Sequence, residues 1–154
     1  MARRTIIQIA LRVCVITERE GKRGQNLIIS FQIKHPKENL EAAAKKLATS
    51  PFRIWGVGCQ RQTPKGKKLD GVYNYSYCCL RLENKEELCG SDLIAELLDA
   101  LESDRKYWSD LVLSGGGFSL VVFSEKNKSS YVEEFDWQLL DRLSNLRISL
   151  GFDV

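Results

Sequence analysis

The sequence contains few residues that could bind a metal ion. It has a single histidine, His35, and its five cysteines include no pair separated by two residues. A structural zinc ion needs about four ligands, drawn mostly from cysteine and histidine. We therefore predict that the protein has no metal site.

Motifs that bind nucleotide cofactors are also missing. Gly56 and Gly58 are not followed by the third glycine and the helix of a dinucleotide-binding fingerprint. Residues 66–68, Gly-Lys-Lys, lack both the earlier glycine and the following hydroxyl residue of a phosphate-binding loop. We predict no cofactor.

No spacing in the chain indicates a catalytic group. His35 and Cys59 are the residues best suited to a nucleophile and its base, yet nothing in the sequence joins them. The glycine run 115–117 has two interpretations, a site that binds an anion or oxyanion and a plain hairpin turn, and the hairpin turn is the simpler one. We predict that the protein is not an enzyme.

The chain has no hydrophobic run close to the ~18 residues that a membrane-spanning helix needs. Gln8 and Arg12 interrupt the apolar stretch that a signal peptide would require. The odd number of cysteines, with Cys78 and Cys79 adjacent, is not typical of a disulfide framework. These features predict a cytoplasmic protein with reduced cysteines and no membrane contact.

What the chain does contain is the composition of an ordinary globular domain. Its 154 residues are 44% hydrophobic and 28% charged, which predicts a single domain over residues 1–154. The net charge of +3 is divided unevenly: residues 1–85 hold 17 basic and 6 acidic side chains, and residues 86–154 hold 6 basic and 14 acidic ones. If the halves interleave, these charges cancel in space, and if they do not, the molecule has faces of opposite sign.

In the first half, most segments alternate apolar and polar residues as half-buried strands do. Residues 5–17 and 27–34 share this alternation, and we expect them to pair as a long antiparallel hairpin. Further strands are predicted at 52–58 and at 71–82, where Tyr73, Tyr75 and Tyr77 fall on one face. The stretch Gln60–Asp70 between them is polar and is predicted to be a loop.

Helical spacing of apolar residues predicts three helices, at 38–48, 91–104 and 131–143. The third would open with a capping box formed by Ser130 and Glu133. Residues 110–114 and 118–124 are predicted to form a second hairpin, and 146–153 the last strand. The expected order is ββαββαββαβ, an α+β fold in which three helices pack on an antiparallel or mixed sheet.

The most distinctive segment runs from Arg53 to Lys68. It holds five cations, one tryptophan and no acid, and its candidate binding residues are Arg53, Trp55, Arg61, Lys65, Lys67 and Lys68. Cations next to an aromatic ring can grip phosphate, stack on bases or contact an acidic protein. A solvated basic loop with Trp55 anchored in the core is the alternative interpretation.

From about Leu27 to Val154 the chain resembles the bacterial family named domain of unknown function 4279. The resemblance is carried by residues 30–33, Trp55 with Gly58 and Lys65–Gly66, 75–77, 93–101, 117–120, and above all 139–153. The family has no established catalytic residues to transfer. Small domains of this kind are similar to those encoded near bacterial toxins, which implies an immunity protein that binds and neutralises one cognate toxin.

The expected function is therefore non-catalytic binding of a protein partner, with a toxin-like effector as the class that the resemblance implies. The alternative is a module that binds a small ligand or nucleic acid through the basic loop 53–68. The sequence leaves the oligomeric state and the identity of the partner open.

Overall fold

The computed structural model describes residues 27–82, 88–124 and 134–153. In these residues it has seven strands and four helices. The strands are β1 Leu27–His35, β2 Arg53–Trp55, β3 Gln60–Gln62, β4 Lys68–Val72, β5 Ser76–Leu82, β6 Gly117–Ser124 and β7 Ile148–Asp153. The helices are α2 Glu41–Lys46, α3 Gly90–Ser103, α4 Arg105–Leu113 and α5 Trp137–Asn145. The fold is α+β, as the sequence predicts.

Five strands form one mixed sheet in the order β2-β5-β1-β6-β7. β1 is the central strand and pairs antiparallel with both β5 and β6, while β7 joins β6 in parallel. The alternation of β1 fits this place, because Ile29, Phe31 and Ile33 are buried on one face while Lys34 on the other face is exposed, and both edges of the strand are paired. β3 and β4 make a separate two-stranded sheet.

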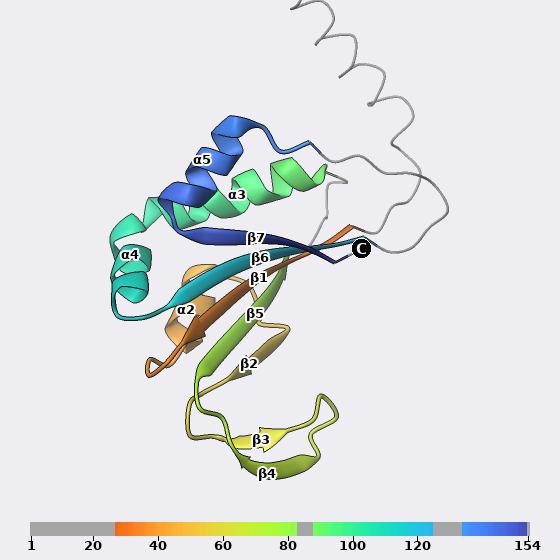
Figure 1. Ribbon diagram of the computed structural model, residues 1–154, viewed down its shortest axis with the longest axis vertical. Coiled ribbons are helices and arrows are strands. Elements are labelled where there is room, and N and C mark those ends of the chain that lie inside the picture. The colour runs from red at the N-terminus through yellow and green to blue at the C-terminus, as the bar shows by residue number, and fades with distance from the viewer. Residues whose placement is uncertain (1–26, 83–87, 125–133, 154) are drawn as a thin grey trace, which may run out of the picture.

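The helices cover one face of the five-stranded sheet (Figure 1). Register places the alternate residues Phe31, Leu80, Leu120 and Leu150 side by side on this face. Leu97, Leu98 and Leu101 of α3, together with Leu139 and Leu143 of α5, pack into the same apolar cluster. Burying this cluster is the main driving force for folding, at about 25 cal/mol for each Å² of apolar surface removed from water.

The predicted pairing of residues 5–17 with 27–34 is wrong. Both edges of β1 are already occupied, with Phe31 opposite Leu80 of β5 on one side and opposite Leu120 of β6 on the other. Alternation reveals which faces of a strand are buried, but it carries no information about which strand lies beside it. The structure of residues 5–17, including the strand predicted around Ile9, lies outside the described residues.

A helix replaces the strand predicted at 110–114. α4 spans Arg105–Leu113, and it buries Trp108 and Leu111, which are three residues apart and so share one helix face. Only β6 remains of the predicted second hairpin, and the glycines at 115–117 join a helix to a strand. The short apolar run was compatible with either element, and helical packing against the core decided it.

The three predicted helices exist with shifted ends. Helix 38–48 is the shorter α2, and helix 91–104 is α3 within one residue. Helix 131–143 begins later than predicted, at Trp137, where the Asp136 side chain accepts a hydrogen bond from the Leu139 backbone N–H at 2.8 Å. The predicted capping residues Ser130 and Glu133 lie outside the described residues, while Glu134, Phe135 and Asp136 are not helical.

Candidate binding surface

Residues 56–75, here called the arm, leave the end of β2 and return at the start of β5. The arm is built on the hairpin of β3 and β4 and projects from the edge of the main sheet, away from α3 and α5 (Figure 1). The predicted loop Gln60–Asp70 is therefore a β-hairpin. Its turn is closed by the Thr63 N–H bonded to the Lys67 carbonyl at 2.8 Å, and Gly66 supplies the positive φ of 79° that the turn requires.

An aromatic stack fixes the base of the arm. The Trp55 ring of β2 lies between the rings of Tyr73 and Tyr77, with centroids 4.6 Å and 4.3 Å away and planes inclined by only 16° and 26°. Tyr75 touches the same ring at 6.1 Å in a tilted arrangement. The tyrosine ladder predicted along one strand is thus a cluster around Trp55, because the chain between β4 and β5 leaves the strand conformation at residues 73–75.

Hydrogen bonds extend the stack into the arm. The Tyr73 hydroxyl donates to the Gln62 carbonyl and accepts from the Gln62 N–H, both at 3.2 Å. The Tyr73 backbone N–H donates to the Cys59 carbonyl at 2.9 Å. Burial and the neighbouring Cys79 raise the pKa of Tyr77 above its ordinary value, so this hydroxyl stays neutral. Ring stacking on Trp55 and these hydrogen bonds therefore attach the arm to the edge of the sheet.

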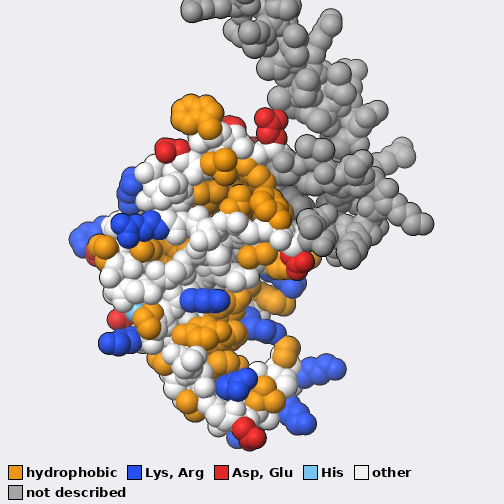
Figure 2. Space-filling view, in the orientation of Figure 1, with side chains coloured by type: hydrophobic (Ala, Val, Ile, Leu, Met, Phe, Trp, Pro, Cys, Tyr) orange, Lys and Arg blue, Asp and Glu red, His pale blue; other side chains and the backbone are white. Residues whose placement is uncertain are grey.

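The structure separates the six predicted binding residues into two groups. Arg53 and Trp55 lie on β2, at the edge of the main sheet, whereas Arg61, Lys65, Lys67 and Lys68 lie on the arm. The five cations are exposed, and Trp55 is half-buried in its stack. Figure 2 shows basic side chains along the lower end of the molecule, where the arm projects.

The arm cations have no acidic partner among the residues that the structure describes. The salt bridges there join Lys46 to Asp104, Lys106 to Asp110, and Arg142 to both Asp99 and Glu102. On the arm, Arg61 donates only to the backbone carbonyl of Asp70, at 3.5 Å. The arm and the acidic helix α3 lie at opposite ends of the molecule (Figure 1), so the acids of α3 do not cancel the charge of the arm.

The sequence pattern did not reveal the apolar side chains that accompany these cations. Five large hydrophobic residues between positions 52 and 72 are at least 38% exposed: Phe52, Ile54, Val57, Leu69 and Val72. Arg81 covers the ring of Phe52, with its guanidinium carbon 3.5 Å from the ring centroid. In the sequence these residues are visible only as apolar positions within a polar stretch. The structure shows that they are exposed and so form a surface.

His35 has a structural role. Its ring is buried, and its Nδ1 accepts the backbone N–H groups of Lys37 at 3.0 Å and Glu38 at 2.7 Å. Nε2 must then carry the proton and donate to the Ser114 hydroxyl 3.1 Å away. In this tautomer His35 has no lone pair free to activate Ser114 as a nucleophile.

The glycine run does not form an anion site. The N–H groups of Gly115 and Gly116 already donate to the carbonyls of Val112 and Leu111 at the end of α4, at 3.0 and 2.9 Å. Backbone amides that end a helix in this way are not available to a ligand. Within the described residues there is also no group of three or more potential metal ligands, and no helix there is long and apolar enough to cross a membrane.

The cysteines in the described residues are free thiols. Cys78 belongs to the core, where burial raises its pKa to about 11, and Cys79 is buried outside the core cluster, as expected for neighbours on a strand. Cys59 and Cys89 are exposed, and Cys14 lies outside the described residues.

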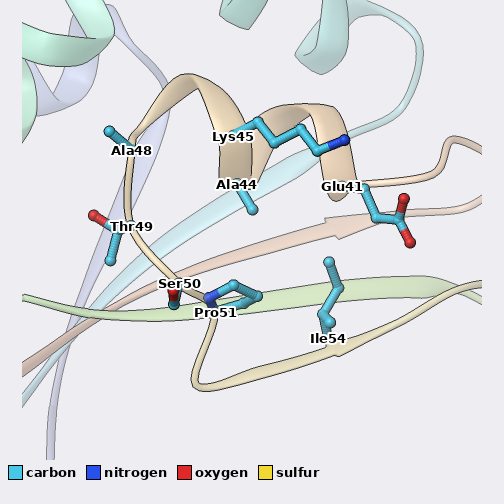
Figure 3. Close-up of a pocket in the computed structure, with 8 residues that line it drawn as sticks. All are labelled: Glu41, Ala44, Lys45, Ala48, Thr49, Ser50, Pro51 and Ile54. Atoms are coloured by element: carbon cyan, nitrogen blue, oxygen red, sulfur yellow. The ribbon is translucent and has the colours of Figure 1, made fainter.

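A shallow hollow of about 350 Å³ lies between α2 and the segment that leads into β2. Ala44, Pro51 and Ile54 point toward its centre, while Glu41 and Lys45 lie at its rim (Figure 3). Small-molecule sites combine an enclosed apolar pocket with a few convergent polar groups. This hollow is open and mainly apolar, so it lacks the features of a small-molecule site. The arm is therefore the better candidate for a binding surface.

Comparison with known proteins gives one match. A family model described as Domain of unknown function (DUF4279) matches residues 25–154, which include every strand and helix described above. No curated protein and no solved structure matches the chain.

Proposed function

The chain belongs to the family called domain of unknown function 4279, and from this membership and the surface of the arm we propose that it is a non-catalytic binding protein for an acidic protein partner. The partner class that we propose is a bacterial toxin, which the chain neutralises by direct contact as an immunity protein. The toxin class follows from the resemblance described above, and the acidic character of the partner follows from the arm.

The observation that supports the proposal is a preorganised cationic arm. Arg61, Lys65, Lys67 and Lys68 stand on a hairpin held by the Trp55 stack, and no acid in the described structure pairs with them. A surface that is already ordered loses little conformational entropy when it binds. Unpaired cations speed the encounter with an acidic partner. Exposed apolar side chains then supply contact area in the complex.

The geometry favours a protein over a single-stranded nucleic acid. Nucleic-acid modules stack bases on exposed aromatic rings. Tyr73 and Tyr77 cover the two faces of Trp55, so a base would have to displace one of them to stack there. Leu69 and Val72 are exposed beside the cations, and apolar residues of this kind suit a protein interface better than a phosphate backbone.

Charge reversal on the arm tests the proposal. The variant carries Arg61→Glu, Lys65→Glu and Lys67→Glu, and its matched control carries the same change at three exposed cations away from the arm, Lys37, Lys45 and Arg105. Each form is co-expressed with the proteins encoded beside it in its genome, and survival, complex formation and association rate are measured over a range of salt concentrations. We expect the arm variant to fold normally, to associate about tenfold more slowly or worse, and to lose the acceleration at low salt, while the control behaves as the wild type.

Two results would contradict the proposal. Equal protection and equal association rates for the arm variant and the wild type would remove the arm from the interface. If the wild type binds none of these proteins but binds RNA or DNA with a steep salt dependence, the nucleic-acid alternative replaces the immunity function.

A further inference from the structure

One face of the main sheet carries no helix among the described residues. The helices pack on the face that holds Phe31 and Leu80 (Figure 1), and the alternate residues of each strand point to the opposite face. Strand register joins five of these alternate residues into one row across the whole sheet: Arg53, Cys79, Gln32, Ser119 and Ser149. This surface, here called the open face, therefore has small and polar side chains across its centre.

Two cations of the open face lie against aromatic rings. The Lys34 ammonium is 5.8 Å from the centroid of the Tyr75 ring, and the Arg81 guanidinium carbon is 3.5 Å from that of Phe52. Lys34, Arg53 and Arg81 are all exposed, and none of them forms a salt bridge with an acid in the described part of the chain. A ring orders a cation without neutralising its charge, so these side chains keep their attraction for carboxylates.

The open face is continuous with the base of the arm. Tyr77 of β5 lies opposite both Trp55 of β2 and Lys34 of β1, so the aromatic stack stands on this face. Tyr75, which belongs to the arm, extends the surface to Lys34. At ~4.8 Å between strands and ~3.3 Å per residue, the backbones of the three cations lie within about 15 Å of one another. The described strands place one acid on this face, Asp153, on the strand farthest from the arm.

We infer that the open face is the second half of the interface with the acidic partner, and that it holds the partner that the arm attracts. The inference rests on the proposed function. Exposed cations at the rim of an interface act mainly on the rate of encounter, which is the role of the arm. On the open face Gln32 and Ser119 are half-buried close to the cations, where a bound partner would exclude water. Charged hydrogen bonds that lose water on binding act mainly on dissociation.

Three variants with the same change in net charge test this division. The face variant carries Lys34→Gln, Arg53→Gln and Arg81→Gln. The arm variant carries Arg61→Gln, Lys65→Gln and Lys67→Gln. The control carries Lys37→Gln, Lys45→Gln and Arg105→Gln. Association and dissociation rates are measured with the partner encoded beside the chain in its genome. We expect the face variant to dissociate about tenfold faster and to associate within about threefold of the wild type, the arm variant to show the reverse, and the control to match the wild type.

A steric variant tests the face without a change of charge. Ser119→Trp places a large ring at the centre of the open face and should weaken the complex about tenfold or more, whereas Ser109→Trp on α4 should leave it unchanged. Urea denaturation shows that each variant folds. Wild-type rates for both the face variant and Ser119→Trp, together with slow association of the arm variant, would overturn this inference and leave the proposed function standing. If the wild type binds none of the neighbouring proteins, the inference and the proposed function fail together.

Discussion

At the residue scale, single side chains decide how the elements of this fold join. His35 at the end of β1 binds the turn that follows it and also reaches Ser114 at the end of α4. Gly116 lies next to this contact, where the chain passes from α4 into β6. The only histidine of the sequence is therefore explained by packing and hydrogen bonding.

We predict that an alanine is poorly tolerated at Gly116 and well tolerated at the neighbouring Gly117. A Cβ at position 116 would lie 2.5 Å from the Leu111 carbonyl oxygen and 3.2 Å from the His35 ring, so Gly116→Ala must displace backbone. We expect it to lower the free energy of unfolding by at least about 2 kcal/mol. Gly117→Ala is the matched control, because a Cβ there meets nothing within 4 Å, and it should change stability by less than about 0.5 kcal/mol. Urea denaturation measures both, and equal midpoints would contradict the prediction.

At the element scale, the arm is a small sheet that cannot bury a core of its own. Isolated two-stranded hairpins are marginally stable in water, so β3 and β4 depend on their attachment to the main sheet. Trp55 and its tyrosines provide that attachment, and they do so at the edge strand β2. The order of the proposed binding surface thus depends on one aromatic residue.

Replacing Trp55 by alanine should release the arm and leave the main sheet intact. We expect Trp55→Ala to lower the free energy of unfolding by about 3 kcal/mol and to speed hydrogen exchange at β3 and β4 more than at β1 and β6. Trp55→Phe keeps an aromatic ring and removes an indole N–H that is buried with no partner in the described residues, so it should cost clearly less. Exchange that rises equally in all strands of Trp55→Ala would show that the stack does not act on the arm alone.

At the scale of the whole molecule, the cations of the arm are separated from the acids of α3. The acidic residues of α3 lie at one end, and the arm cations lie at the other. Arg142 of α5 relieves part of the acidic repulsion, because it holds Glu102 of α3 through two hydrogen bonds of 3.0 and 2.8 Å and also reaches Asp99. This contact lowers the pKa of Glu102 below its ordinary value and raises that of Arg142.

The Arg142 contact should stabilise the protein at neutral pH and not in acid. Because the folded state lowers the pKa of Glu102, the contribution is fully present above the carboxyl's unfolded pKa of about 4.3 and is lost as the pH falls through the folded value. We expect Arg142→Gln to cost about 1 kcal/mol at pH 7, less at high salt, and close to nothing at pH 3. Lys106→Gln, which breaks an exposed pair within one helix, is the control and should cost less than Arg142→Gln at pH 7. A cost for Arg142→Gln that is independent of pH would contradict the assignment to Glu102.

The sequence by itself determined the class of this fold and most of its elements. Alternation in β1 and β7, the apolar run of β6 and the leucine spacing of α3 are local signals, set by which side chains must leave water, and they identify these elements directly. The sequence also identified the cationic segment 53–68 as a candidate surface, because its five cations and its lack of acids can be counted directly. The strand predicted at 110–114 was wrong, because the short apolar run in α4 suits a helix and a strand equally well.

Only the tertiary structure decided which elements meet. It made β1 a central strand, turned a predicted loop into the arm, and gathered Tyr73 and Tyr77 around Trp55. The physical reason is that strand pairing uses backbone groups, which are the same in every residue, so neighbours are chosen by the burial of the whole chain at once.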